Sequence, residues 1–168
     1  MNLGVTIIKG RRSVRNYKDT PIPANVVRDA IDCARQAPTA MNVQPWLFGI
    51  VTDTGILAKL AGLADHGKFI AQAPLCFAVF SDTSHTYYLE DGCAATDQLI
   101  LGLWAHGVAS CWVAGEKKEY AETVRTLLNV PEGYALISLI PAGYPAEIKI
   151  VEKKNVTDIT FHERWESK

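Results

Sequence analysis

Three arginines and a serine lie within five residues near the N-terminus, in the run Arg11-Arg12-Ser13-Val14-Arg15. An extended chain points alternate side chains to opposite faces, so Arg11, Ser13 and Arg15 would share one face. Guanidinium groups bind phosphate through paired hydrogen bonds, and they stay charged at any working pH. The run therefore predicts a site for an elongated anion. The alternative is a solvated basic turn, whose surface ion pairs contribute little.

A second polar segment covers residues 37–46, with the sequence APTAMNVQPW. It follows a helical pattern and precedes an apolar run, and two prolines bracket the amide side chains of Asn42 and Gln44. Such a composition predicts an ordered loop that carries polar groups. The alternative is an ordinary connection between a helix and a strand.

Taken together, the two segments resemble the nitroreductase family of FMN-dependent oxidoreductases. Members of that family have RRSxRxF/Y near the N-terminus and APSxxNxQPW further along, and both motifs line the flavin. Similar stretches continue at residues 91–103, 107–115 (GVASCWVAG), 141–145 and 162–165 (HERW). The resemblance extends through almost the whole chain, and it implies a homodimer with FMN in the interface.

The resemblance gives each residue of the arginine run a role. Arg11 and Ser13 would hold the phosphate and ribityl end of FMN, and Arg15 would lie near the N1 and C2-carbonyl edge of the flavin. Arg12 would lie on the opposite face and would touch the ribityl chain or nothing. A cation at the N1 edge would stabilise the anionic reduced flavin and raise its reduction potential.

The far wall of the flavin would come from the other subunit. The residues implied there are Pro38, Thr39, Ala40, Asn42 and Gln44. The commoner family residue after the proline is serine, whereas this chain has Thr39 followed by Ala40, which has no hydroxyl. One side-chain hydrogen bond to the cofactor would therefore be lost.

Other cofactor contacts are implied further along the chain. Backbone amides of Trp112, Val113, Ala114 and Gly115 would reach the flavin N5 and O4 region, and a glycine lets the main chain come close. His66 and Lys68 precede the second strand, where the family often has a polar residue against the pyrimidine ring. The alternative for Lys68 is a solvated surface lysine.

The C-terminal cation of the phosphate site would be Lys153 or Lys154, because Asn155 and Val156 replace the usual basic and proline residues. A solvated lysine pair is the alternative. This chain is also short for the family and lacks the extended lid of longer members.

Length, charge and residue composition exclude several classes of protein. The 168 residues fit a single domain, residues 1–168, and 17 basic side chains nearly cancel 18 acidic ones. We therefore expect no binding to nucleic acid or to a membrane surface. No run has the length of a signal peptide or membrane span, which predicts a cytoplasmic protein. The four cysteines and four histidines show no metal-ligand spacing, so we expect no metal, and a dithiol oxidoreductase is disfavoured.

Apolar periodicity predicts helices over residues 3–9, 23–36, 54–64, 87–106 and 116–128. It predicts a buried strand over 46–52 and further strands over 75–80, 108–113 and 135–142. Gly10 would end the first helix in a left-handed conformation, Thr54 would cap the third and Gly107 would close the fourth. There is no GxGxxG motif, so a Rossmann nicotinamide site is not supported.

The resemblance implies an α+β fold, with a mixed and mostly antiparallel sheet between helices on both faces. Residues 145–168 would form a C-terminal arm around the partner subunit, since they are too polar to build a core yet include Phe161 and Trp165. The apolar helix over residues 91–106 would pack in the core or the dimer interface.

The implied activity is hydride transfer from NADH or NADPH through FMN to a nitroaromatic, a quinone or a similar small acceptor, with ping-pong kinetics. No side chain would act as an essential general acid or base, since the motifs supply cations and amides. The alternatives are a flavin-binding or redox-sensing protein without turnover, and dehalogenation or flavin cleavage on the same fold.

Overall fold

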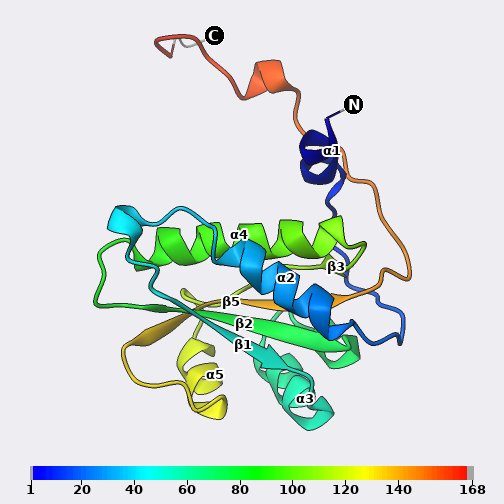
Figure 1. Ribbon diagram of the computed structural model, residues 1–168, viewed down its shortest axis with the longest axis vertical. Helices are drawn as coiled ribbons and strands as arrows, with labels where there is room; N and C mark the ends of the chain where they lie inside the picture. Colours follow the sequence, from blue (N-terminus) through cyan, green and yellow to red (C-terminus); the bar gives the residue numbers. More distant parts are fainter. Residues whose placement is uncertain (1, 166–168) are drawn as a thin grey trace.

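The computed structural model describes residues 2–165, in which five strands form one sheet (Figure 1). Strand β1 (Trp46–Val51) pairs with β2 (Leu75–Asp82), and β2 pairs with β5 (Tyr134–Gly143). Two short strands, β3 (Ala109–Ser110) and β4 (Val113–Ala114), both pair with β5. All these pairings are antiparallel, and a parallel contact occurs at an isolated bridge between Ser13 and Ser110. The expected α+β architecture is confirmed.

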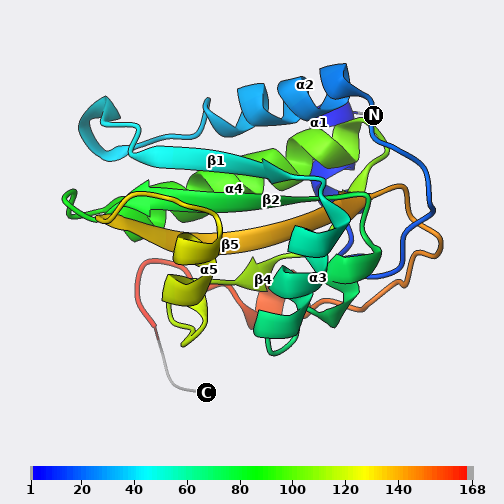
Figure 2. The same cartoon turned by 90° about the horizontal axis from the view of Figure 1, so that it is seen from below.

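Helices cover both faces of the sheet (Figures 1 and 2). Helices α2 (Ala24–Ala34) and α4 (Tyr88–Ala105) lie on one face, and α3 (Thr54–Leu63), α5 (Ala121–Leu127) and the short helix η2 (Lys68–Gln72) lie on the other. Strand β2 serves both cores because its side chains alternate. Phe77 and Val79 pack toward α2 and α4, whereas Ala78 and Phe80 pack toward α3 and α5.

Helix α4 is fixed to the sheet by small residues and one polar pair. A Cβ on Gly92 would lie 2.7 Å from the Ile137 side chain, so only glycine allows this close approach. The Thr96 hydroxyl donates to the Gly92 carbonyl at 2.8 Å and lies 3.0 Å from the Ser138 hydroxyl. These contacts fix α4 against β5. Segments that contact the two ends of the helix are therefore held in place as well.

Two predicted helix signals are wrong. Helix α1 (Leu3–Gly10) includes Gly10, whose φ is not positive, and the helix ends because Arg11 is extended, with φ −56° and ψ 134°. Helix α3 is capped by Asp53, whose carboxylate accepts from the Ile56 N–H at 2.8 Å, because the capping residue precedes the first helical residue. Gly107, with φ +73°, ends the turn after α4 as expected.

Several predicted boundaries also change. The strand expected over residues 108–113 is divided into β3 and β4, and the strand at 46–52 is an edge strand on which Ile50 is 49% exposed. Helix α2 begins after Pro23 and is shorter than predicted. Helix α5 begins at Ala121, because residues 116–120 form turns in which the Lys118 N–H donates to the Gly115 carbonyl.

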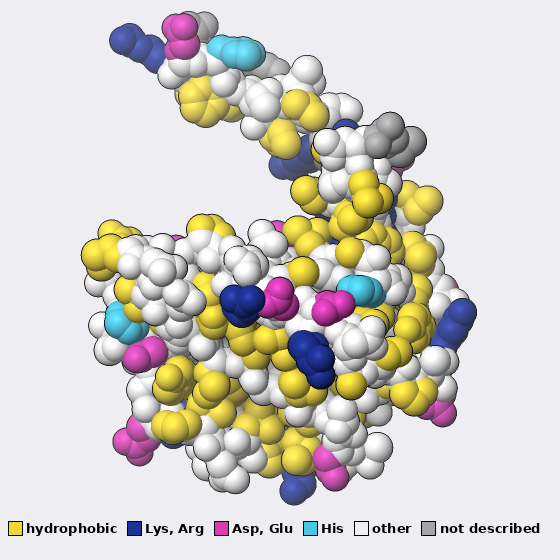
Figure 3. Space-filling model, in the orientation of Figure 1, with side chains coloured by type: hydrophobic (Ala, Val, Ile, Leu, Met, Phe, Trp, Pro, Cys, Tyr) yellow, Lys and Arg dark blue, Asp and Glu magenta, His cyan; other side chains and the backbone are white. Residues whose placement is uncertain are grey.

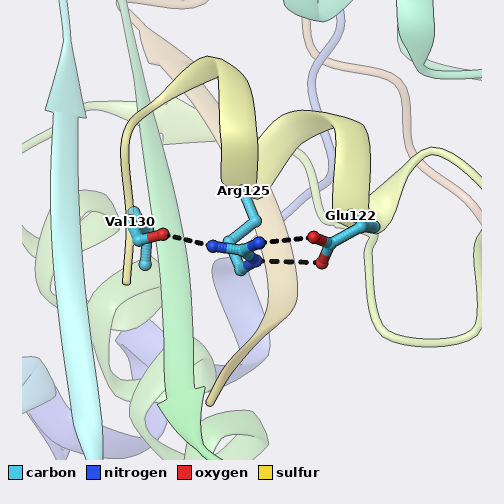
Figure 4. Close-up of polar contacts among 3 residues, drawn as sticks. All are labelled: Glu122, Arg125 and Val130. Carbon is cyan, nitrogen blue, oxygen red and sulfur yellow. Dashed lines mark hydrogen bonds and ion pairs between the residues drawn. The ribbon is translucent and has the colours of Figure 1, made fainter. Parts of the chain in front are cut away.

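The turn between α5 and β5 is held by Arg125 (Figure 4). Its guanidinium binds the Glu122 carboxylate through two nitrogens and donates to the Val130 carbonyl at 2.5 Å. The hydrogen bond from Arg125 lowers the pKa of Glu122. One side chain thereby joins the helix to the loop that leads into the central strand.

Helix α1 and the chain after β5 project from the α4 side of the body (Figure 1). None of the α1 residues is buried, and the projecting chain contains the short helix η3 (Val156–Asp158). Figure 3 shows apolar side chains along both. Met1 of the predicted domain and residues 166–168 of the predicted arm lie outside the described residues. Within residues 2–165, no helix has the length and apolar character needed to cross a membrane.

Candidate functional site

The arginine run forms an extended segment beside β3. Val14 is buried and its N–H donates to the Ser110 carbonyl at 3.0 Å, and the Lys18 N–H donates to the Tyr144 carbonyl at 2.8 Å. Tyr17 is buried as well, and its Cβ would lie 2.9 Å from any Cβ on Gly143, so the glycine makes room for it. The buried side chains hold the segment down while the cationic ones stay accessible.

The accessible side of this segment faces the start of the C-terminal arm across a hollow of about 390 Å³. Its lining residues are Arg11, Arg12, Ser13, Val14, Arg15, Asn16, Glu147, Lys149, Val151 and Lys153. The predicted cations therefore come together with Lys153, whereas Lys154 is not in the lining. The Glu147 carboxylate pairs with the Lys149 ammonium at 3.0 Å, which lowers the net positive charge of the lining.

Arg12 differs from the other arginines. Its guanidinium donates to the carbonyls of Lys9 and Arg11, at 2.8 and 2.9 Å, and so completes the end of α1. Arg12 nevertheless lines the same hollow as Arg11 and Arg15, so the structure does not set it apart on an opposite face, and its role toward a cofactor stays a prediction.

A second hollow, of about 240 Å³, continues from Arg15. Its lining residues are Arg15, His66, Phe69, Cys111, Trp112, Val113, Ala114, Lys118 and Tyr120. The Arg15 guanidinium carbon lies 5.8 Å from the centre of the Phe69 ring. Aromatic rings and cations together suit a flat, electron-rich or anionic ring system. Arg15 lines both hollows and so lies where the two approach each other.

His66 and Lys68 are separated by the fold although they are close in sequence. His66 lines the second hollow, whereas the Lys68 ammonium donates to the Gly62 carbonyl at 3.1 Å at the end of α3. Lys118 does line the second hollow and pairs with Asp65 at 3.4 Å. The signal that could have found Lys118 is its position just after the GVASCWVAG segment.

Strand β4 offers one backbone donor to the second hollow. The Gly115 N–H is already used, since it donates to the Ile137 carbonyl at 3.1 Å. Bonding alternates along an antiparallel pair, so the N–H of Ala114, opposite Ser138, points away from β5. The structure thus assigns the outward amide to Ala114. Gly115 instead allows close packing, because a Cβ there would lie 2.6 Å from the Leu136 carbonyl oxygen.

Two further groups at this site are buried and keep their protons. Burial raises the pKa of Tyr17 far above its ordinary value. Burial also raises the pKa of Cys111, against the opposing effect of the Arg15 and Arg11 charges and a hydrogen bond with Ser13. The Cys111 thiol therefore lies beside the arginine run as a neutral group. Within residues 2–165, no cluster of three or more His, Cys, Asp or Glu side chains could hold a metal ion.

None of residues 38–44 lines either hollow. Met41, Asn42 and Gln44 have positive φ angles of 52°, 57° and 55°, which non-glycine residues rarely adopt. Within the loop, the Gln44 amide donates to Asn42 Oδ1 at 3.1 Å, and the Gln44 N–H donates to Thr39 Oγ1 at 3.4 Å. The loop is ordered, and its polar groups partly satisfy one another.

The two predicted parts of the site lie at opposite ends of α4. The loop is held at the first turn of the helix, where the Ala40 N–H meets Asp91, and the arginine run follows Gly10, which packs against Trp104 in the last turn. With 18 residues, α4 is about 27 Å long. A single chain therefore does not bring Asn42 and Arg15 together.

Comparisons with known proteins identify the family. The model of the Nitroreductase family matches residues 8–67 and 64–144, so the chain belongs to the nitroreductase family. A Methanothermobacter thermautotrophicus protein, provisionally named NADH dehydrogenase/NAD(P)H nitroreductase, is 30% identical over 83% of this chain and 76% of its own. The Thermotoga neapolitana iodotyrosine deiodinase is 25% identical over 96% of this chain and 99% of its own.

A solved structure gives the same result for the fold. The FMN-dependent nitroreductase of Clostridium difficile R20291 superposes with a TM-score of 0.86 at 25% identity, covering 98% of this chain and 99% of that one. The predicted family is therefore confirmed, and the predicted fold with it.

Proposed function

We propose that the protein is an FMN-dependent oxidoreductase in which both hollows hold one FMN molecule. The position of Arg15 in the lining of both hollows carries the proposal, since it would place a phosphate site beside a ring site. The name of the Clostridium difficile neighbour supports FMN as the cofactor. When bound, FMN would supply hydride chemistry, with NADH or NADPH as the reductant and a nitroaromatic, quinone or similar molecule as the acceptor.

The chain's own residues fit that cofactor. Arg11, Ser13 and Lys153 would hold the phosphate dianion, because they combine fixed charge with hydrogen-bond donors around one hollow. Arg15 would place positive charge at the ring, where reduction creates negative charge. The outward N–H of Ala114 would donate to a ring acceptor from a rigid strand.

Among the described residues, no carboxylate lines the second hollow, called the ring hollow below. This supports catalysis in which the protein positions the reactants and stabilises charge, without an acid–base side chain. We expect His66→Ala to keep appreciable turnover when FMN is saturating. A loss of more than about a thousandfold, the scale of an acid–base residue, would contradict this. Parallel double-reciprocal lines are expected, because reductant and acceptor would use the same space in turn.

The test begins with the purified protein, which should be yellow and carry about one FMN per chain. Anaerobic addition of NADH or NADPH should bleach the flavin within seconds, and a panel of nitroaromatics and quinones should restore its colour. A colourless protein that does not take up added FMN would exclude the proposal. Bound FMN that resists bleaching by either nicotinamide would favour the redox-sensing alternative.

Reductive dehalogenation is a second candidate, because the iodotyrosine deiodinase aligns with nearly the whole chain. Release of iodide from an iodinated phenol by the reduced protein, measured beside nitroaromatic turnover, separates the two activities. Faster iodide release would assign the protein to dehalogenation.

We also propose a homodimer in which the loop at residues 38–44 of one chain completes the FMN site of the other. Exposed apolar side chains on α1 and on the arm support this, with Leu3 74%, Ile150 84% and Trp165 70% exposed. Surfaces of this kind gain burial from another subunit. The arm, residues 145–168, would wrap that subunit.

Subunit complementation tests this arrangement. The double variants Arg11→Ala/Arg15→Ala and Asn42→Ala/Gln44→Ala should each bind FMN poorly. When they are unfolded together and refolded at equal amounts, about a quarter of the sites should recover, because half of the dimers are mixed and each has one intact site. No recovery, with mixed dimers verified by two different tags, would place both segments at separate sites.

A further inference from the structure

Two tyrosine hydroxyls in this site bond to backbone carbonyls of the two segments that would contact FMN. The Tyr17 hydroxyl lies 2.6 Å from the Val14 carbonyl oxygen and 3.0 Å from the Pro141 carbonyl oxygen. The Tyr120 hydroxyl donates to the Ala114 carbonyl oxygen. Each tyrosine thus joins a site segment to the body of the protein through one hydroxyl.

The bond of Tyr17 is placed where it controls the cationic side chains. Val14 lies between Ser13 and Arg15, so a fixed Val14 carbonyl sets the orientation of both neighbours. Pro141 belongs to β5, and its carbonyl also accepts from the Cys111 N–H at 3.3 Å. A hydroxyl has a single proton, so the Tyr17 hydroxyl donates to the nearer Val14 carbonyl and shares that proton with the Pro141 carbonyl. The shared bond keeps the arginine run beside the central strand at the phosphate end.

The hydrogen bond of Tyr120 holds the segment at the ring end of the site, as that of Tyr17 holds the segment at the phosphate end. The Ala114 carbonyl and the Ala114 N–H both point away from β5, because this residue sits at the non-bonded position opposite Ser138. Strand β4 has only two residues, so it has few sheet bonds of its own to fix its outer edge. The Tyr120 hydroxyl supplies an additional bond at the residue that offers the outward amide.

Both hydroxyls can act as donors at any working pH. Burial raises the pKa of Tyr17, and burial together with the Asp65 charge raises the pKa of Tyr120. Phenylalanine would keep the rings and remove only these bonds, leaving each carbonyl without this donor.

We infer that Tyr17 and Tyr120 are positioning residues that separately align the phosphate end and the ring end of the cofactor site. The inference rests on the proposed function, because it needs FMN to occupy both hollows. It goes further by assigning each end its own anchor, and it predicts that the two ends can be disturbed independently.

The experiment compares FMN with riboflavin, which has the same ring and no phosphate. Dissociation constants are measured by flavin fluorescence for the wild-type protein, Tyr17→Phe, Tyr120→Phe and the control Tyr134→Phe, a tyrosine on β5 that lines neither hollow. Tyr17→Phe should weaken FMN by about tenfold and leave riboflavin within about twofold. Tyr120→Phe should weaken both flavins by a similar factor, and Tyr134→Phe should change neither.

A merely structural role would give a different result. It would lower the thermal unfolding temperature of the FMN-free variant without changing the ratio of the two dissociation constants in Tyr17→Phe, and without weakening riboflavin binding in Tyr120→Phe. A second measurement, the ³¹P resonance of bound FMN, should move toward that of free FMN in Tyr17→Phe and stay unchanged in Tyr120→Phe. Equal ratios in all four proteins, or an unmoved ³¹P resonance in Tyr17→Phe, would overturn the inference. Failure of the wild-type protein to bind either flavin would instead overturn the proposed function.

Discussion

The backbone N–H of Ala40 donates to a carboxylate oxygen of Asp91 at 3.2 Å, although 51 residues separate the two in sequence. Asp91 lies in the first turn of α4 and is only 6% exposed. Its bond holds the base of a loop in which Met41 and Asn42 have left-handed backbone angles. Such conformations persist only where surrounding contacts stabilise them, and they are common at ligand sites.

Removing this contact should disorder the loop. We expect Asp91→Ala to weaken FMN binding by about 1–3 kcal/mol, because the Ala40 N–H loses its acceptor and the loop relaxes. Asp91→Asn should retain most of the affinity, since its amide oxygen can still accept. Titration of the FMN-free protein with FMN measures both. Equal affinities for the alanine variant and the wild-type protein would show that the loop does not depend on Asp91.

Removing the charge of each of the three arginines in turn should weaken FMN binding by different amounts. Arg11→Gln and Arg15→Gln should each weaken FMN by about 1.5–3 kcal/mol, the scale of a charge-assisted hydrogen bond. Arg12→Gln should have a smaller effect on FMN, because that guanidinium bonds to the carbonyls of Lys9 and Arg11. Arg28→Gln on α2 is a control for loss of charge. Calorimetric titration at two salt concentrations checks the order, and a dominant Arg12 effect would contradict it.

The arrangement of the arginine run could be predicted because it depends only on neighbouring residues in the sequence. Alternation in an extended segment already implies that Ser13 and Arg15 point away from the buried Val14, and the structure has this arrangement. The family motifs added order and spacing along the chain, which identified the fold. Local helix signals were less reliable, since Gly10 continues its helix where a left-handed end was expected.

Other features depend on contacts that the sequence does not reveal. Asparagine tolerates positive φ, but Met41 does so only because residues distant in sequence hold the loop. Lys118 enters the ring hollow from a turn after β4, whereas Lys68, next to a predicted site, binds the end of α3. Tertiary position separates these two lysines, and local sequence does not reveal it.

A pair of glycine substitutions tests the close packing of β4. Gly115→Ala should lower the free energy of unfolding by about 1–3 kcal/mol, because its Cβ would lie 2.6 Å from the Leu136 carbonyl oxygen and must push β4 from β5. Gly62→Ala on α3 meets nothing within 4 Å and should stabilise by about 0.5–1 kcal/mol. Urea unfolding of both variants measures the difference, and a neutral Gly115→Ala would mean that β4 is loosely packed.

Stability should also fall in alkaline solution because of buried acidic groups. Burial raises the pKa of the Cys76 thiol well above its ordinary value, and Cys76 is fully buried in β2. Above about pH 9 the unfolded chain loses this proton while the folded chain keeps it, so the folded state binds more protons. The free energy of unfolding should therefore be unaffected by this group at neutral pH. It should decrease by up to about 1.4 kcal/mol per pH unit above pH 9.

The variant Cys76→Ala tests this sign. It should lower stability at neutral pH through the small cavity that it leaves, yet its stability should fall less steeply than that of the wild-type protein between about pH 9 and 10.5. Cys33→Ala, a half-buried thiol on α2, serves as the control for loss of a cysteine. Urea unfolding at several pH values gives the slopes. The slope for the wild-type protein should still be negative after correction for Cys76, because burial also raises the pKa of Tyr17. Identical slopes for the wild-type protein and Cys76→Ala would show that the thiol is accessible to hydroxide in the folded state.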